Sequence, residues 1–460
     1  MSFEEALNFL NSRRNFEVSR NFGAVDFGGR LVRLREFVNY LGCPDKKYKI
    51  VHVAGTKGKG STCVFLEGIL LGAGAVVGRF TSPHLYSFLE RVIVNGIPCG
   101  ESEFAETMLY IRDKMELFDL RLSEEITFFE LLTVFSFEYF ARRSVDFVLF
   151  EVGLGGRFDA TNICYPAITV IANLSFDHIE QLGPTLCDIA REKGGIIKSG
   201  VPLISSVCDV GAREVLCGIV ESCGAPVYFE GESFVVEPVS VAGQFEFKTV
   251  EDKFPVRAEF GELNVRMAGK HQRHNASLAI AAALLLQDEF VFDNETIRNG
   301  LAKGFLPARV EIFQDRLDEP VFVVDGAHNR ASAEVFVEAL RGLFPARRKF
   351  LVFGTTMGKD VEGMLVELLP NFRTVFMTQY SSNPRFFPPI GLRTIAEAIL
   401  PTLKLGRDEC SMSVVDDCSV ALDKCFELAG KNDIICVTGS LFLAAELREY
   451  YLNRIKANKK

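Results

Sequence analysis

A glycine-rich segment between an apolar run and a helical pattern constrains the fold of this chain more than any other feature. The run KIVHVA (49–54) leads into GTKGKGST (55–62), and CVFLEGILLGAG follows. Glycines let backbone amides turn inward around an anion, and a following helix presents the positive end of its dipole to that anion. The order of strand, glycine-rich loop and helix therefore predicts a phosphate-binding loop at the edge of a parallel sheet.

The side chains of this loop suit the binding of a nucleotide triphosphate. Lys59 is expected to lie over the β and γ phosphates, and Ser61 or Thr62 is expected to reach Mg²⁺. The spacing departs from the usual consensus, because Gly60 separates Lys59 from Ser61. An ordinary glycine-rich turn with solvated lysines is the alternative, and the crowding of glycines, lysines and hydroxyls at one strand end argues against it. The predicted ATP-binding residues of the loop are Gly55, Thr56, Lys57, Gly58, Lys59, Gly60, Ser61 and Thr62.

Short apolar runs followed by helical patterns recur along the chain and predict an α/β protein. Continuous apolar strands of this kind are typical of parallel sheets covered on both faces. With 460 residues, 48% of them apolar, the chain exceeds what one hydrophobic core usually serves. We expect a phosphate-loop parallel-sheet domain at 1–307, with antiparallel hairpins between 227 and 265, and a Rossmann-like α/β domain at 308–460. The expected strands are 49–54, 145–152, 167–174, 310–313, 321–328, 350–356, 374–380 and 434–440.

The composition argues against nucleic-acid and membrane partners and favours a reducing compartment. The net charge of -9, without long runs of either sign, argues against a nucleic-acid partner, which would require a basic surface. The twelve cysteines contain no C-x-x-C pair and fit a reducing compartment. The N-terminus lacks the pattern of an export signal, and the most apolar window (276–286) is too short to span a bilayer. We therefore expect a cytoplasmic protein without a membrane partner.

Polar residues at strand ends are candidate metal and nucleotide ligands. Glu151 ends the run VDFVLFE at the sheet edge where α/β proteins bind ligands, and a carboxylate there suits Mg²⁺. His178, beside Asp177, is by itself more typical of a hydrogen-bonded loop residue, because Mg²⁺ prefers oxygen ligands. Asn275 is expected to open and cap the apolar helix that follows it. Arg309 offers a planar fork suited to phosphate oxygens.

Several motifs together resemble those of a known enzyme family. The loop GTKGKGST followed by TSPHL (81–85) resembles the nucleotide loop and the folate-side loop of the folylpolyglutamate synthase/dihydrofolate synthase family, in the Mur ligase superfamily. Each motif alone is weak, but their ordered conjunction covers nearly the whole chain and is specific. The further matching segments are 127–130, 151–162, 177–178, 191–195, 273–275, 307–309 and 325–329.

The resemblance implies a Mur ligase middle-domain fold and a glutamate-binding C-terminal domain. It also implies an ATP-dependent enzyme that joins L-glutamate to the carboxylate of a reduced folate or of dihydropteroate through an acyl phosphate. The implied cofactor is Mg²⁺, as two ions, and the implied assembly is a monomer. Two rivals stay open: a Mur-type ligase of cell-wall synthesis, which TSPHL disfavours, and a nucleotide-gated binding protein that does not ligate. Action on dihydropteroate is also open, because FDATN (158–162) looks like bacterial bifunctional enzymes whereas the phosphate loop also resembles eukaryotic forms.

The resemblance further implies roles for individual residues. Lys59, Glu151 and Lys193 are the implied catalytic residues, and Lys193 is either carbamylated or a free amine that holds a phosphate. Strand ends 354–356 and 438–440 are candidates for the glutamate pocket. The implied metal ligands are Ser61, Ser82, Glu151 and His178, and the implied ATP contacts outside the loop are Asn275, Arg309 and Asp325. The implied folate or pteroate contacts are Ser82, Pro83, His84, Thr127, Phe128, Phe129, Glu130, Phe158, Asp159 and Ala160.

Overall fold

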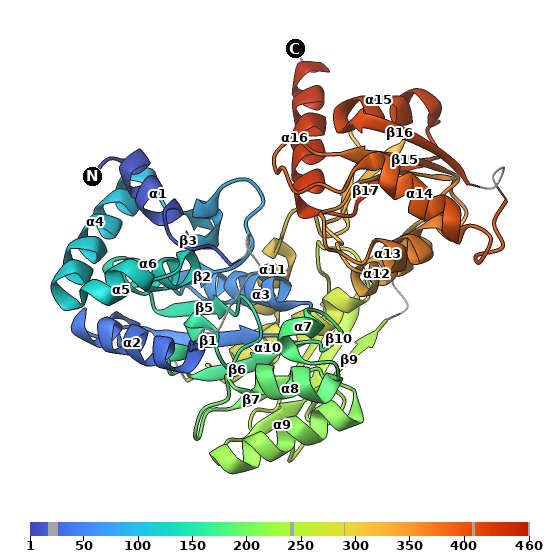
Figure 1. Cartoon of the computed structure of the whole chain (residues 1–460). Helices are drawn as coiled ribbons and strands as arrows, with labels where there is room; N and C mark the ends of the chain where they lie inside the picture. The colour runs from blue at the N-terminus through green and yellow to red at the C-terminus, as the bar shows by residue number, and fades with distance from the viewer. Residues whose placement is uncertain (17–25, 240–242, 289, 407–409, 459–460) are drawn as a thin grey trace. The chain divides into compact units, whose positions relative to one another are not determined.

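A computed structural model describes residues 1–16, 26–239, 243–288, 290–406 and 410–458 of the chain (Figure 1). The chain divides into two compact units. The first comprises Met1–Arg266 and Arg273–Phe305, and the second comprises Met267–Gln272 and Leu306–Lys460. The short segment Met267–Gln272 therefore belongs to the second unit although the first unit flanks it in sequence.

The first unit is built on an eight-stranded sheet with the order β4-β3-β2-β5-β1-β6-β7-β8. Strands β2, β5, β1, β6, β7 and β8 run parallel, and β3 and β4 extend one edge with antiparallel pairing. The strands are β1 (Lys49–Ala54), β2 (Val77–Phe80), β3 (Val92–Val94), β4 (Ile97–Pro98), β5 (Phe147–Glu151), β6 (Ile168–Ile171), β7 (Leu203–Ser205) and β8 (Val227–Phe229).

Helices cover both faces of this sheet. On one face, Val148 and Phe150 of β5 join a core with residues of helices α1, α2, α4 and α6. Side chains alternate along a strand, so Glu151 points to the opposite face, which helix α3 covers. The α-helices are α1 (Phe3–Asn11), α2 (Phe27–Tyr40), α3 (Lys59–Gly72), α4 (Glu101–Phe118), α5 (Leu120–Glu125), α6 (Phe128–Arg142), α7 (Ile179–Leu182), α8 (Leu186–Gly194), α9 (Val210–Cys223), α10 (His271–Leu284) and α11 (Asn294–Lys303). The 3-10 helices of this unit are η1 (Pro44–Lys46), η2 (Phe88–Arg91) and η3 (Ala160–Ile163).

Glycines allow α3, the helix that follows the phosphate loop, to pack closely against α11. A Cβ added to Gly68 would lie 2.2 Å from the carbonyl oxygen of Gly300, and one added to Gly300 would lie 2.5 Å from Cα of Ile69. These distances are shorter than non-bonded atoms allow, so any side chain at either position would separate the two helices. The contact therefore fixes α3 and, with it, the start of the helix at Lys59.

A three-stranded antiparallel sheet is appended to the first unit. Its order is β11-β10-β9, with β9 (Phe234–Pro238), β10 (Phe245–Thr249) and β11 (Glu259–Leu263). The prediction of antiparallel hairpins is confirmed for these strands. It is wrong for Val227–Phe229, which pairs with β7 in parallel and belongs to the main sheet.

The second unit contains a six-stranded sheet with the order β12-β13-β17-β14-β15-β16. All neighbours are parallel except β12 and β13, and the core lies between the sheet and helices on its faces. Its strands are β12 (Glu311–Phe313), β13 (Val321–Val324), β14 (Lys349–Phe353), β15 (Thr374–Gln379), β16 (Ser411–Asp417) and β17 (Ile434–Thr438). Its helices are α12 (Arg330–Leu343), α13 (Val361–Leu368), η4 (Leu369–Asn371), α14 (Pro389–Ile399), α15 (Cys418–Leu428) and α16 (Leu441–Asn458).

The predicted α/β architecture is confirmed, with a parallel-sheet first unit and a mixed sheet in the second. Two local predictions are wrong. Helix α10 begins at His271, so Asn275 lies in its second turn and is not its cap. The strand expected at Val310 begins one residue later, because Val310 has a left-handed φ of 47°. Within the described residues, no helix is long and apolar enough to cross a membrane.

Candidate active site

The segment Gly55–Thr62 forms a loop at the carboxyl end of β1 and the first turn of α3. Its start is tied to the segment after β6: the Thr56 amide donates to the Asn173 carbonyl at 2.7 Å, and the Thr56 hydroxyl donates to the Ser175 carbonyl at 3.0 Å. Lys57 Nζ lies 3.1 Å from the Asp177 carboxylate. The loop is therefore held by hydrogen bonds along its first half, while its second half enters the helix with N–H groups that an anion can use.

Gly58 is the N-terminal neighbour of α3 and meets Asn275 of α10. Its φ is 86°, a conformation that residues with a Cβ rarely adopt, and an added Cβ would lie 2.2 Å from Oδ1 of Asn275. The structure thus brings a predicted ATP contact on α10 against the phosphate loop. The requirement for glycine at this position has two separate causes, the backbone angle and the contact.

We expect Gly58→Ala to destabilise the fold by about 2 kcal/mol or more, because it adds a steric clash to a backbone conformation that costs about 1 kcal/mol. Urea unfolding followed by circular dichroism would measure the loss. Gly42→Ala is the matched control, because Gly42 has a φ of 88° and nothing within 4 Å of its added Cβ. Equal losses at the two positions would show that Asn275 contributes nothing to the requirement.

Lys59, Glu151 and Ser82 come together at the carboxyl edge of the sheet. Lys59 Nζ donates to the Gly55 carbonyl at 3.0 Å and lies 3.9 Å from Oε1 of Glu151. The other oxygen of Glu151 accepts the Ser82 amide at 3.0 Å. The Glu151 carboxylate is buried, with 5% exposure, so its charge is poorly screened by water. This arrangement links the phosphate loop to the segment TSPHL through one carboxylate.

The oxygen atoms at this edge fit a magnesium ion that is held mainly by phosphates and water. Glu151 supplies one carboxylate, Ser61 is buried in the first turn of α3, and the buried Thr62 Oγ1 has no hydrogen-bond partner within the described residues. Mg²⁺ is usually bound by one or two carboxylates together with substrate phosphates. A cage of three or more His, Cys, Asp or Glu side chains does not occur among the described residues. His178 is half-exposed, with Nε2 at 3.7 Å from the Asp177 carboxylate.

Lys193 is a buried lysine on α8 with an exposure of 4%. Burial, aided by the like charge of Lys59 and opposed by the carboxylates of Asp177 and Asp159, lowers the pKa of Lys193 to about 7. A lysine with this pKa is neutral in about half of the molecules at neutral pH, which makes its amine a nucleophile. The amine therefore has the protonation behaviour that reaction with carbon dioxide requires.

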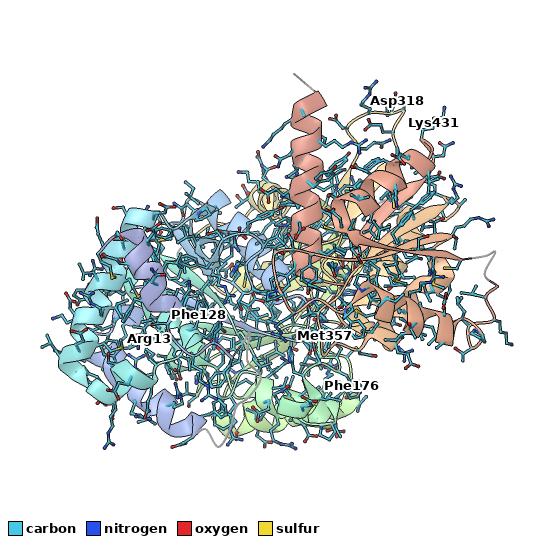
Figure 2. The ribbon with its side chains drawn as sticks, turned by 45° about the horizontal axis from the view of Figure 1, so that its top comes forward. Arg13, Phe128, Phe176, Asp318, Met357 and Lys431 are labelled. Carbon is cyan, nitrogen blue, oxygen red and sulfur yellow. The ribbon has the colours of Figure 1, made fainter. Side chains whose placement is uncertain are left out.

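The predicted contact residues at 127–130 make local contacts within the fold. Thr127 and Glu130 form a capping box at the start of α6, with the Thr127 hydroxyl donating to Glu130 at 2.8 Å. Arg30 of α2 donates to both oxygens of Glu130, at 2.9 and 2.6 Å. Burial raises the pKa of Glu130, but the hydrogen bonds and charge of Arg30 outweigh burial and leave that pKa below its usual value. Phe128, labelled in Figure 2, joins the core, with the Arg91 guanidinium 5.6 Å from its ring centre.

Asp159 organises the loop between β5 and η3. Its carboxylate accepts the amides of Gly153 and Leu154 at 3.0 Å each, and it also accepts the amide and hydroxyl of Thr161 at 3.0 and 2.5 Å. Burial raises the pKa of Asp159 against these hydrogen bonds. Phe158 beside it is 43% exposed. This loop therefore presents an aromatic ring to solvent from a hydrogen-bonded base, while Ala160 is buried at the start of η3.

Phe129 and His84, two further predicted folate contacts, each contact a neighbouring segment of the first unit. Phe129 covers the loop after β5, because a Cβ added to Gly153 would lie 2.7 Å from its ring. Nδ1 of His84 accepts a hydrogen bond from Nε of the buried Arg91 at 2.9 Å. The peptide bond between Ser82 and Pro83 is cis. The segment 82–84 thus has a defined conformation beside Glu151.

Arg309 lies in the second unit, between two residues with left-handed backbone conformations. Ala308 and Val310 have φ of 55° and 47°, and such a value is especially rare for valine, with its branched Cβ. Asp325 holds this turn, since one of its oxygens accepts the Val310 amide at 2.9 Å and the other accepts the Ala327 amide at 2.8 Å. The predicted ATP contacts Arg309 and Asp325 therefore belong to one hydrogen-bonded turn.

Strand ends in the second unit carry a group of hydroxyls. β14 and β17 are parallel neighbours, and Thr355 and Thr438 at their ends are buried with Oγ1 atoms that lack a hydrogen-bond partner in the described part of the chain. Thr356 is bonded to the Tyr380 hydroxyl at 2.7 Å. Unsatisfied buried hydroxyls are costly unless a ligand or water completes them. This edge is therefore a candidate polar ligand site.

Sequence reasoning misses the basic side chains that support these segments. Arg30, Arg79 and Arg91 lie near the folate-side segments, and their partners are distant in sequence or lie in another element. An arginine inside an apolar run is the available signal for Arg79, in VVGRF. Arg30 follows two glycines and Arg91 follows a glutamate, and neither local pattern indicates the contact that the structure shows.

Known domain families and individual proteins match this chain over most of its length. Residues 53–283 match the Mur ligase middle domain, and residues 308–441 match the Mur ligase glutamate ligase domain. The chain is 33% identical to the dihydrofolate synthase/folylpolyglutamate synthase of Bacillus subtilis, over 97% of this chain and 99% of that protein. It is 30% identical to the folylpolyglutamate synthase of Lacticaseibacillus casei, over 91% of this chain and 94% of that protein.

A solved structure supports the same assignment. The folylpolyglutamate synthase of Mycobacterium tuberculosis complexed with ADP matches with a TM-score of 0.83 and 27% identity, covering 98% of each chain. The matches in sequence and in structure extend over both units. The chain therefore belongs to the folylpolyglutamate synthase/dihydrofolate synthase family of Mur ligases and is an ATP-dependent ligase.

Proposed function

We propose that this chain joins L-glutamate to the carboxylate of a reduced folate, with ATP as the energy source and an acyl phosphate as the intermediate. The observation that carries the proposal is the contact of Glu151 with both Lys59 of the phosphate loop and the Ser82 amide of the TSPHL segment. One buried carboxylate thus connects the loop proposed to bind ATP with the segment proposed to bind folate. The names of the relatives from Bacillus subtilis and Lacticaseibacillus casei support this substrate class.

The proposed seat of ATP is the loop Gly55–Thr62 together with Asn275. Lys59 would exchange its hydrogen bond with the Gly55 carbonyl for the β and γ phosphates, whose charge its ammonium neutralises. Asn275, which adjoins Gly58, would contact the nucleotide from α10. Arg309 and Asp325, in the second unit, are proposed as further ATP contacts, because a guanidinium suits phosphate oxygens.

The proposed magnesium ligands are Glu151, Ser61, Ser82 and His178, with two ions in the site. Of these, Glu151 carries the strongest argument, because its buried carboxylate is an oxygen ligand at the edge of the sheet. Magnesium would neutralise charge that develops on the phosphate oxygens during phosphoryl transfer.

The proposed reaction has two steps. A carboxylate oxygen of the folate attacks the γ phosphorus in line, the bond to ADP breaks, and an acyl phosphate forms. The α-amine of glutamate then attacks the acyl carbon, loses a proton, and displaces phosphate to give the amide. Much of the rate would come from holding the reactants in register, for which rigid contacts such as that between Ser82 and Glu151 are suited.

The proposed glutamate site lies at the carboxyl edge of the second sheet, at 354–356 and 438–440. The partnerless hydroxyls of Thr355 and Thr438, as seen among the described residues, support this location, since a carboxylate or ammonium group of an amino acid would complete them. The match of 308–441 to the glutamate ligase domain supports the same choice.

Dihydropteroate is proposed as a second acceptor. Phe158 supports this proposal, because its half-exposed ring offers a stacking surface for a flat heterocycle. The same pocket is proposed to be lined by the segments 82–84, 127–130 (which includes Phe129) and 158–160. The relative from Bacillus subtilis is named for both activities, whereas that from Lacticaseibacillus casei is named for folylpolyglutamate synthesis alone.

Lys193 is proposed to act either as a carbamate or as an amine that holds a phosphate. We expect bicarbonate to carbamylate Lys193, to an extent that rises as the pH passes through about 7, where burial places the pKa of its amine. Alkylation of the carbamate oxygen, followed by peptide mass spectrometry, would trap and locate the group. Lys248 is the internal control, because its side chain is 62% exposed on β10 and should stay unmodified. If Lys193 stays unmodified at pH 8, the carbamate is rejected, and the role as a free amine that holds a phosphate remains.

ADP release with varied acceptors tests the proposed function. We expect release to require both L-glutamate and a folate, with tetrahydrofolate and dihydropteroate compared under the same conditions. A cell-wall ligase would need a peptidoglycan precursor, and a nucleotide-gated binding protein would release ADP without either substrate. ADP release that is equally fast with and without folate and glutamate would therefore reject the proposal. Release that occurs with tetrahydrofolate but not with dihydropteroate as the acceptor would reject the dihydropteroate activity.

A further inference from the structure

A buried ion pair lies between the phosphate-loop helix and the strand that leads to Ser82. Glu67 of α3 and Arg79 of β2 are each 6% exposed, and Nε of Arg79 donates to Oε2 of Glu67 at 2.7 Å. The same guanidinium donates from Nη1 to the Thr81 hydroxyl at 3.0 Å. Arg79 thus bridges a helix and a loop with two hydrogen bonds from one rigid fork.

These contacts close a ring around the candidate site. Lys59 and Glu67 lie on the same helix, α3, and Lys59 approaches Glu151 at 3.9 Å. Glu151 accepts the amide of Ser82, whose neighbour Thr81 accepts from Arg79. The ring therefore passes from the phosphate loop through the folate-side segment and returns to the phosphate-loop helix.

Stability alone is a poor explanation for this ion pair. Burying two charges carries a large desolvation cost, and apolar residues of similar volume are often at least as stabilising. Val77, two residues before Arg79 and on the same face of β2, is apolar and fully buried, so an apolar side chain suits this face of the strand. What an apolar side chain would lack is the directed hydrogen bond to Thr81.

We propose that Arg79 is a positioning residue that holds Thr81 and Ser82 in register with Glu151, and so couples the folate-side segment to the phosphate-loop helix. The kinetic part of this inference rests on the proposed function, whereas the coupling itself is a property of the fold. Arg79 touches Thr81 and Glu67 and acts through them.

The variant Thr81→Val isolates the positioning contact. It removes the hydroxyl that accepts from Arg79 and keeps the shape of the side chain and the pair with Glu67. We expect kcat/KM for the folate to fall about tenfold, as loss of a hydrogen bond to a charged group predicts. The KM for ATP should stay within about threefold, because Thr81 and Arg79 lie outside the loop proposed to bind ATP.

Two variants of Arg79 extend the test. Arg79→Met removes both hydrogen bonds and is expected to lose at least as much kcat/KM as Thr81→Val. Arg79→Lys should recover part of the loss, because an ammonium can pair with Glu67 but lacks the planar fork that reaches both acceptors. Should Arg79→Met fail to fold, Thr81→Val still decides the inference.

Hydrogen exchange supplies a readout that is independent of activity. The Ser82 amide is protected by its bond to Glu151, so peptides that include Ser82 should exchange faster in Thr81→Val than in the wild-type protein. Arg213→Met is the control, because it removes an ion pair with Glu232 at 2.6 Å in the same unit and should leave exchange at Ser82 unchanged.

Wild-type exchange at Ser82 in Thr81→Val would overturn the coupling, and faster exchange with unchanged kcat/KM would overturn its kinetic role. A wild-type protein without folate-dependent ADP release would instead reject the proposed function. The exchange comparison would then still decide whether Arg79 positions Ser82.

Discussion

Lys59→Ala is expected to lower kcat by about a thousandfold or more, because it removes the cation proposed to neutralise the transferred phosphoryl group. The fold should survive. Lys59 is the first residue of α3, and its ammonium donates to the Gly55 carbonyl and makes a longer contact with Glu151. ADP release would measure the loss, and circular dichroism with thermal melting would report the fold.

Lys248→Ala provides the control for this variant. Lys248 lies on β10 of the same unit with 62% of its side chain exposed, and it pairs only loosely with Glu259 at 3.5 Å. Its loss removes the same charge at a distance from the sheet edge and should leave ADP release unchanged. Turnover of Lys59→Ala within tenfold of the wild type would contradict the phosphate role of Lys59.

Glu151→Gln is expected to lower kcat by about a hundredfold or more and to raise the magnesium concentration needed for half-maximal activity. The amide keeps an oxygen that can accept from Ser82, so the local geometry should persist. What it loses is the negative charge, on which the affinity of a hard cation depends. A magnesium titration of ADP release would separate weaker metal binding from a loss of fold.

Glu138→Gln is the matched control, since Glu138 is also a buried carboxylate in the first unit, 7% exposed and paired with Arg142 at 2.7 Å on α6. It should leave the magnesium requirement unchanged. If Glu151→Gln kept the wild-type magnesium dependence, Glu151 would be a structural anchor for Ser82 and no metal ligand.

The sequence predicts best those elements whose local pattern is compatible with only one kind of secondary structure and marks where that element ends. β1 matches its expected range at both ends, because an apolar run is followed at once by a glycine that turns the chain. The same reasoning places Glu151 at the end of β5, and the structure then brings it to Lys59. The candidate site can therefore be outlined from strand ends alone.

Other features depend on contacts that no local pattern contains. The sequence does not predict β2, because Arg79 interrupts its short apolar run, and the pairing with Glu67 is what makes the burial of that arginine acceptable. The predicted start of α10 is wrong because its first turn is polar and the apolar run begins later. The burial that lowers the pKa of Lys193 is likewise a tertiary property, which the sequence around it does not reveal.

The assignment of Met267–Gln272 to the second unit has a consequence for dissecting this protein. Met267 is buried, and Ala268 packs against the core of the second unit. A fragment that ends at Phe305 would keep this segment but lose the core that it packs against, while the complementary fragment would lack the segment. A single cut in the chain therefore cannot separate the two units and leave both intact. The simplest way to obtain either unit in its native packing is to produce the whole polypeptide.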